Sequence, residues 1–325
     1  MNNRFACIKL FALLCAACTS AGAASEQNYP ARPVRFVVPY PPGAGVDIIT
    51  RLFTPELSEL LGQQFIVDNR AGAAGNIGAE IAARATNDGY HLLMAPASIA
   101  ISHSFARNLR YNLKTDFDAV VLIGSAPFVL VVHPSLPVKT TRDLIALAKA
   151  SPGKLSYASS GTGSPGHLSG AKFNAQAGID MLHVPFKGTT ASVTDVIGGR
   201  VSLLFGNTLS VLPHVKAGRL RALGITSAKP SSAAPGVVTI AESGLPGFAS
   251  GTWFSVLVPK GTPRGIIRRL NAAFNEILKM QDARDSLGRQ GVEPRGGTAE
   301  EAASFIAAEI ESWAQAVAAA GAHAR

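Results

Sequence analysis

The stretch KLSYASSGTGSPGHLSGAKFNAQAGIDMLHVP, from Lys154 to Pro185, contains the pattern that decides the fold. Lys154 to Ala158 has the composition of a short strand, and a turn rich in glycine follows it. His167 to Ala177 then predicts a helix that Gly178 closes, and Asp180 to Pro185 predicts a second strand. Strand, helix and strand in this order form a βαβ unit, whose crossover we expect to be right-handed.

A second unit with the same plan lies nearer the N-terminus. Val34 to Tyr40 predicts a strand, Pro41 to Gly45 a glycine turn, Asp47 to Leu61 a helix, and Gln64 to Asp68 the next strand. Pro55 either kinks this helix or marks a break in it. Strands that alternate with helices along the chain predict an α/β protein.

Two apolar segments that end in proline resemble each other. They are FVLVVHP, from Phe128 to Pro134, and FSVLVP, from Phe254 to Pro259. They are either ordinary sheet strands or a pair of crossover strands that join two lobes. The second interpretation divides the chain into a discontinuous lobe 1, residues 25–126 and 250–325, and a lobe 2, residues 127–249.

The C-terminal region predicts a well-specified helix. Thr298 to Glu301 (TAEE) has the pattern of a capping box. Apolar residues follow at spacings of four, three and four, which is the period of one helix face. We expect this stripe to pack into the core: Ile306, Ile310, Trp313 and Val317.

The first 24 residues have the features of a secretory signal peptide. Arg4 and Lys9 supply positive charge, Leu10 to Ala17 form a short apolar core, and Ala21 to Ala23 offers small residues for cleavage. The segment is too short for a membrane helix, and no later apolar run approaches ~18 residues. We therefore expect residues 1–24 to be removed and the product to be periplasmic.

All three cysteines lie inside this signal segment, at Cys7, Cys15 and Cys18. The mature chain is then expected to have no disulfide, no thiol nucleophile and no zinc–thiolate site. Lipid attachment at Cys18 is the alternative to plain cleavage. A cysteine three residues before it is a poor match to a lipid-attachment motif.

Composition fits a folded protein with one large or two smaller domains. The chain has 325 residues, of which 47% are hydrophobic and 16% charged, so it can bury a sizeable core. Its formal charge of +9 falls to +7 when two signal-peptide cations are removed. The remaining basic residues are scattered, with no run longer than Arg268–Arg269, and this distribution argues against nucleic-acid binding.

The glycine turn of the first unit spells G-x-G-x-x-G, with Gly161, Gly163 and Gly166 in the glycine places. This is the dinucleotide-binding fingerprint, which also needs an acidic residue at the end of the following strand. That strand end offers Lys187, while Asp180 lies at the wrong end. We therefore expect no nicotinamide cofactor. The turn retains the properties of an anion cradle, since glycine lets a ligand approach and a helix start attracts negative charge.

Common catalytic patterns are missing from the sequence. It has no G-x-S-x-G elbow, no H-E-x-x-H pair and no P-loop. Ser151 to Lys154 matches S-x-x-K, but the intervening Pro-Gly makes the required helical turn unfavourable. His91, His133, His183 and His214 are dispersed and lack metal-ligand spacing. We expect neither an enzyme nor a metal or cofactor site.

A second glycine turn, Pro41 to Asp47 (PPGAGVD), also opens a helix, and Gly72 to Gly78 (GAAGNIG) precedes a third. Each lobe would then offer one helix start that attracts an anion, and we expect the two to form a clamp across a cleft. The two main turns contain no arginine or lysine. Backbone amides, the hydroxyls of Ser160, Thr162 and Ser164, and bridging water would therefore recognise the anion.

Nearly the whole mature sequence resembles the Bug family, the extracytoplasmic receptors of tripartite tricarboxylate transporters. The matching motifs include YPARPVRFVVPYPPGAGVD (29–47), VDNRAGAAGNIG (67–78), YASSGTGSPGHL (157–168), HVPFKG (183–188) and PKGTP (259–263). The resemblance implies a two-lobed, type II periplasmic-binding-protein fold that closes on a small organic carboxylate. It also implies delivery to the membrane permease subunits of such a transporter, by a monomeric receptor.

In the family, the loops that match Pro41–Asp47 and Ser159–His167 hold one carboxylate end, partly through water. Regions that match Ser98 and Phe205–Thr208 line the rest of the pocket. The resemblance, together with the two glycine turns, gives a predicted ligand-binding set: Pro42, Gly43, Ala44, Asp47, Asn76, Ser98, Ser160, Gly161, Thr162, Gly163, Ser164, His167, Phe186 and Asn207.

Several positions depart from the family pattern towards a more apolar pocket. Phe186 replaces a tyrosine, Ala171 a glutamate, and Gly206 an acidic residue that often lies in the pocket; Pro42, Ala44 and Val46 also differ. These changes disfavour an amino-acid ligand, because they remove groups that could bind an ammonium.

Two residues keep alternative roles. Asp47 either meets the ligand or is an ordinary helix N-terminal acid, and we favour the structural role because a bare carboxylate repels another. His167 either donates to the bound anion or caps and orients its loop. The functional alternatives are a secreted enzyme acting on a carboxylate in the same cleft, and a ligand-sensing module for a signalling partner.

Overall fold

The computed structural model describes residues 28–105, 108–186 and 188–319. The predicted signal peptide and all three cysteines lie outside these residues. Within the described ranges, no helix combines the length and the hydropathy needed to cross a membrane.

The first half of the sheet has the strand order β2-β1-β3-β9-β4. β1 pairs in parallel with β2 and β3, as the βαβ pattern predicts. β9 is antiparallel to both of its neighbours, β3 and β4, and the short β10 also pairs with β4. The strands are β1 (Val34–Val38), β2 (Phe65–Asn69), β3 (His91–Pro96), β4 (Phe117–Val132), β9 (Gly251–Pro259) and β10 (Glu293–Pro294).

The second half continues through β4 to β7, β5 and β6, with β8 also paired to β4. β5 runs parallel to β6 and β7, which confirms the βαβ unit predicted from Lys154 to Pro185. β7 and β8 are both antiparallel to β4. The strands are β5 (Ser156–Ser159), β6 (Leu182–Pro185), β7 (Leu203–Asn207) and β8 (Arg221–Ile225).

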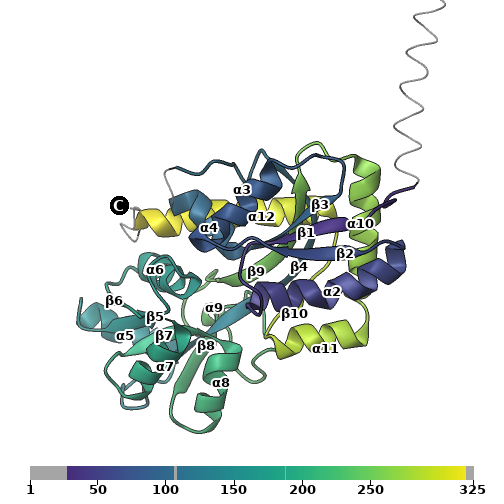
Figure 1. Cartoon of the computed structure of the whole chain (residues 1–325). Coiled ribbons are helices and arrows are strands. Elements are labelled where there is room, and N and C mark those ends of the chain that lie inside the picture. Colours follow the sequence, from purple (N-terminus) through teal and green to yellow (C-terminus); the bar gives the residue numbers. More distant parts are fainter. Residues whose placement is uncertain (1–27, 106–107, 187, 320–325) are drawn as a thin grey trace, which may run out of the picture.

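β4 is one continuous strand that belongs to both halves. Its residues 117–127 pair with β9, and its residues 128–132 pair with β7 and β8. Figure 1 shows the result, a lobe around β1, β2 and β3 and a second lobe around β5 to β8, with β4 running between them. The apolar run Phe128–Pro134 is thus largely the second half of a longer strand.

Thr226, which is fully buried, ties the strands together where they pass between the lobes. Its backbone N–H donates to the Phe128 carbonyl, and its hydroxyl accepts from the Phe128 amide at 2.8 Å. The same hydroxyl donates to the Ser250 carbonyl at 2.6 Å. One threonine therefore links the second half of β4 to the segment that leads into β9.

Helices cover both faces of the sheet. They are α2 (Gly45–Leu61), α3 (Asn76–Ala83), α4 (Ala97–Phe105), α5 (Thr141–Ala150), α6 (Pro165–Ala177), α7 (Thr189–Ile197), α8 (Thr208–Lys216), α9 (Ile240–Ser243), α10 (Arg264–Ile277), α11 (Gln281–Arg289) and α12 (Ala299–Ala319), with a 3₁₀ turn η1 (Ala73–Gly75). α2 continues through Pro55 without ending there. α2 and α6 each begin two residues before the predicted start.

The C-terminal helix α12 confirms its predicted cap and core stripe. Thr298 and Glu301 exchange the two hydrogen bonds of a capping box, at 2.8 and 3.0 Å. The predicted stripe from Ile306 to Val317 is buried. α12 also contacts α6 of the other lobe, where Lys172 Nζ donates to Ser312 Oγ at 2.7 Å.

Candidate functional site

The turn between β1 and α2 is shaped by Gly43, whose φ of +81° lies in the left-handed region that favours glycine. Ala44 follows as the N-cap with φ −68° and ψ 154°. The Gly43 N–H donates to Asp47 Oδ2 at 2.9 Å, so a side chain four residues later closes the turn.

Asp47 is 2% exposed and all of its contacts lie within lobe 1. Besides Gly43, it accepts from Arg51 Nε and from Asn69 Nδ2, each at 2.9 Å. Burial alone would raise the pKa of this carboxyl, but the hydrogen bonds from Arg51, Gly43 and Asn69 outweigh burial and hold the pKa below its usual range. Asp47 is therefore an ionised carboxylate that fixes the turn.

The start of α2 leaves backbone donors unused. An N-cap side chain normally accepts one of the first free N–H groups of a helix, and Ala44 has none to offer. Ile48 N is the first amide to bond back, to the Ala44 carbonyl at 3.0 Å. In the described chain, the amides of Gly45, Val46 and Asp47 have no acceptor. This helix start can therefore donate to an anion.

The turn between β5 and α6 repeats this geometry. Gly163 has φ +77°, and Ser164 follows as the N-cap with the same dihedral angles as Ala44, −68° and 154°. The Gly163 N–H donates to Nδ1 of His167 at 3.1 Å, again a side chain four residues later. Here the cap is filled, because Ser164 Oγ accepts from the His167 amide at 3.3 Å.

The His167 contact fixes the protonation of the ring. A backbone N–H can only donate, so Nδ1 holds a lone pair and the neutral ring carries its proton on Nε2. Burial lowers the pKa of His167, which favours this neutral form. The two clamp turns thus use different acceptors, an ionised Asp47 in lobe 1 and a neutral imidazole in lobe 2.

A cavity of about 210 Å³ lies where α6, α7 and α8 begin, beside the carboxyl ends of β5 and β7. Its lining is Phe128, Ser159, Ser160, Pro165, Gly166, Thr189, Ser192, Leu204, Phe205, Gly206, Asn207 and Thr252. None of these described residues carries a charged side chain. The polar lining consists of hydroxyls, one amide and the starts of three helices, which suits an anion held by neutral donors.

The start of α7 was missed in the sequence. Its N-cap is Gly188, which has no side chain, and the first amide to bond back is that of Ser192. The amides of residues 189–191 have no acceptor in the part of the chain that the structure describes. The motif HVPFKGTT, a strand followed by glycine and two threonines, carries the same strand–turn–helix signal as the other two turns.

The structure brings two members of the predicted ligand-binding set to this cavity, Ser160 and Asn207. Asn207 also caps α8, accepting from the Ser210 amide at 2.9 Å. Phe186 packs against the apolar cluster of lobe 2 instead of lining the cavity. Gly161, Thr162, Gly163, Ser164 and His167 form the turn beside it without lining it.

The predicted residues of lobe 1 form separate groups. Pro42, Gly43, Ala44 and Asp47 belong to the α2 turn, and none of the lobe 1 set lines the cavity. Ser98 Oγ lies 2.9 Å from the Tyr40 hydroxyl and donates to the Ala74 carbonyl at 3.2 Å. Asn76 Oδ1 accepts from the Tyr111 hydroxyl at 2.7 Å.

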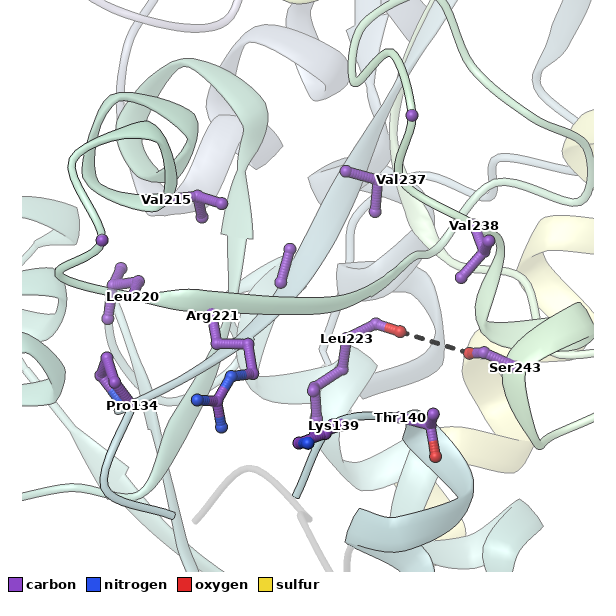
Figure 2. A pocket seen from close by; sticks show the side chains of 13 residues that line it. Pro134, Lys139, Thr140, Val215, Leu220, Arg221, Leu223, Val237, Val238 and Ser243 are labelled. Atoms are coloured by element: carbon purple, nitrogen blue, oxygen red, sulfur yellow. Dashed lines mark hydrogen bonds between the residues drawn. The ribbon is translucent and has the colours of Figure 1, made fainter. Parts of the chain in front are cut away.

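Larger cavities lie elsewhere and contain none of the predicted residues. One of about 490 Å³ lies beside β8 (Figure 2), where Ser243 Oγ donates to the Leu223 carbonyl at 3.3 Å. Arg221 in its wall donates to the carbonyls of Leu136 and Val138. Another, of about 1000 Å³, lies beside the start of α10. Volume alone does not identify a site, and both larger cavities have charged side chains in their walls, so neither combines several helix starts with an uncharged lining as the smaller one does.

Residues 49–322 match the family described as "Tripartite tricarboxylate transporter family receptor". Protein BugT of Bordetella pertussis is 38% identical over 296 residues, which cover 90% of this chain and 91% of BugT.

Two solved structures are similar over most of the chain. The R. palustris protein Rpa4515 with adipate has a TM-score of 0.72 and 36% identity, covering 90% of this chain and 98% of that one. MatC of Rhodopseudomonas palustris with bound malate has a TM-score of 0.70 and 29% identity, covering 89% and 100%.

Proposed function

The chain belongs to the tripartite tricarboxylate transporter receptor family, and we propose that it captures a small organic dicarboxylate between its two lobes. The receptor would deliver this solute to the membrane permease subunits of a transporter of that type. It would act in the periplasm, as a monomer and without catalysing a reaction. Its lobe limits would be those expected from the sequence, with lobe 2 spanning residues 127–249.

The convergence of three helix starts on an uncharged cavity carries this proposal. α6, α7 and α8 all begin at the cavity, and α7 contributes unused amides there. Amides at a helix start point along the helix dipole and favour negative charge. Because the cavity contains no described cation, a bound carboxylate would be held by neutral donors. Such donors avoid the free-energy cost of stripping water from a positively charged partner.

The uncapped start of α2 supplies the second group of donors. Its free amides, Gly45 to Asp47, belong to lobe 1, whereas the residues that line the cavity, apart from Thr252, belong to lobe 2. A solute with a carboxylate at each end can bind both groups of donors at once when the lobes approach. The adipate of Rpa4515 and the malate of MatC are acids of this kind, and both support a dicarboxylate here.

The absence of a described acid from the cavity lining argues against an amino acid. A bound ammonium needs a carboxylate or several carbonyls directed at it, and the lining offers Gly206 where an acid is usual in the family. Asp47 is buried and already accepts hydrogen bonds from Gly43, Arg51 and Asn69, which direct its carboxylate into the turn and away from a ligand. In this proposal Asp47 and His167 shape the clamp turns and do not touch the solute.

Thermal unfolding with a panel of organic acids tests the proposal. Adipate and malate are the main probes, with hexanoate as the matched acid that has one carboxylate and glutamate as the matched acid with an ammonium. A ligand present at about 100 times its dissociation constant stabilises the folded state by ~2.7 kcal/mol. We expect adipate or malate to raise the melting temperature, and hexanoate and glutamate to leave it unchanged. Stabilisation by glutamate or hexanoate alone would refute the proposed ligand class.

A further inference from the structure

A cluster of three rings lies directly behind the β5–α6 turn. The imidazoles of His167 on α6 and His183 on β6 are stacked, with ring centroids 3.9 Å apart and planes at 28°. Tyr157 on β5 lies 5.1 Å from the His183 ring, and its hydroxyl donates to the His167 carbonyl at 3.3 Å. His167 is buried and His183 is half-buried, and the contact between them calls for an explanation because each ring can take up a proton.

Ser159, at the end of β5, joins this cluster to the turn. Its hydroxyl donates to the Gly161 carbonyl at 3.0 Å and accepts from the Gly161 amide at 3.1 Å. It also lies 2.7 Å from Nε2 of His183. A hydroxyl has one hydrogen and two lone pairs, so with its hydrogen on Gly161 the contact to His183 requires the imidazole to donate.

A serine and a histidine at 2.7 Å could also be a nucleophile and its base, which is the arrangement an enzyme would use. The direction of the hydrogen bond opposes this role, because a base must accept the serine proton. In the described chain, no carboxylate forms a hydrogen bond with either imidazole, so neither ring has the orienting acid of a triad. The contact therefore serves the shape of the turn.

We propose that His183 is a positioning residue for solute capture, which holds the turn through Ser159 and through the stacked His167. The hydrogen bond of Ser159 fixes Gly161, and the acceptor Nδ1 of His167 fixes Gly163. Ser160, which precedes Gly161, and Pro165, two residues after Gly163, line the cavity. This inference rests on the proposed function, in which the turn shapes the cavity that holds the solute.

The arrangement also makes the turn sensitive to acid. Protonation of His167 at Nδ1 would remove the acceptor of the Gly163 amide and place a cation against His183. Tyr157 is the other titratable group in contact with the pair, and within the described residues no acid or base from any element packed against them forms a hydrogen bond or salt bridge with either ring. Burial, and then the neighbouring His167, lower the pKa of His183 to about 4. Burial also lowers the pKa of His167, so the turn is intact at neutral pH and loosens in acid, when His167 takes up a proton.

His183→Phe tests the proposal, because it keeps a ring to stack and removes the donor to Ser159. Amide hydrogen exchange at Gly161 and Gly163 reports on the turn without any ligand. We expect exchange at both amides to become about tenfold faster or more, the equivalent of one lost hydrogen bond. His183→Gln, which keeps a donor, restores most of the protection. The matched control is His133→Phe, since His133 contacts Ser135 at 2.7 Å in the same lobe but away from the turn.

The variants also separate this inference from the proposed function. With adipate and malate as probes, we expect His183→Phe to bind about tenfold more weakly and the control to bind like the wild type. If the wild type binds neither acid, the proposed ligand class fails, and the exchange measurement still decides the role of His183. Unchanged exchange in a folded His183→Phe would overturn the inference. If that variant does not fold, Ser159→Ala removes the same link, and unchanged exchange at Gly161 there would overturn it equally.

Discussion

Replacing Ala44 by serine would give α2 the N-cap side chain that it lacks. The backbone is already suitable, because Ser164 has the same dihedral angles and its hydroxyl caps the equivalent amide of α6. A serine N-cap in place of alanine stabilises a helix by about 1 kcal/mol, which raises the melting temperature of a protein of this size by roughly 2 °C. The new hydroxyl would accept from the Asp47 amide.

The same substitution should weaken solute binding, since that amide is one of three that we assign to a carboxylate. A hydrogen bond to a charged group contributes about 1.5–3 kcal/mol, so losing one lowers affinity roughly tenfold to a hundredfold. Ala44→Ser should therefore raise stability and lower affinity together, measured by thermal unfolding and by calorimetric titration with adipate and malate.

A matched control separates helix capping from solute binding. Thr140→Ala removes the N-cap of α5, where Thr140 Oγ1 accepts from the Asp143 amide at 3.1 Å. This variant should lose about 1 kcal/mol of stability without changing affinity. If Ala44→Ser gains stability while its affinity stays at the wild-type value, the amides of α2 do not bind the solute.

Three further predictions follow from the turns and their acceptors. Gly161→Val should abolish binding while the protein still folds, because the φ of +138° is unsuited to a β-branched residue; wild-type affinity in calorimetry would remove this turn from the site. Asp47→Asn should lower the free energy of unfolding by about 1–3 kcal/mol, measured with denaturant, because Arg51 and Asn69 lose a buried anion; an unchanged midpoint would contradict the role of Asp47. The lowered pKa values of His167 and His183 mean that the unfolded chain binds more protons below pH 6.5, so the free energy of unfolding should be constant above that pH and fall towards pH 4; a flat profile down to pH 5 would contradict this.

Much of the fold could be predicted because its signals are local. The two βαβ units follow from runs of β-rich residues, glycine turns and helix stops within about thirty residues each. The capping box at Thr298 and the apolar stripe that follows it specify α12 without reference to the rest of the chain.

The length of β4 could not be predicted, because its two halves pair with different partners that are distant in sequence. Residues 117–127 pair with β9, and residues 128–132 with β7 and β8. The composition of one strand does not show that it enters two halves of a sheet. The composition of the two segments that end in proline therefore fits two interpretations, and the structure combines both.

The candidate site was predicted in part for a similar reason. Glycine turns marked two helix starts, but which amides stay free depends on acceptors that only the fold brings close. The Gly163 amide already donates to His167, whereas the first amides of α2 stay free because Ala44 has no side chain that could accept from them. The contribution of α7 was overlooked because its single glycine, Gly188, makes a weaker motif than G-x-G-x-x-G.

We propose that one solute is held at once by the start of α2 and by the lobe 2 cavity. Titration of ¹⁵N-labelled protein with adipate and with malate, followed amide by amide, tests it most directly. We expect the amides of Gly45 and Val46 in lobe 1 and of Thr189 and Thr190 in lobe 2 to shift together and saturate at one dissociation constant. If saturating amounts of both acids leave the chemical shifts of either group of amides unchanged, the dicarboxylate clamp is contradicted.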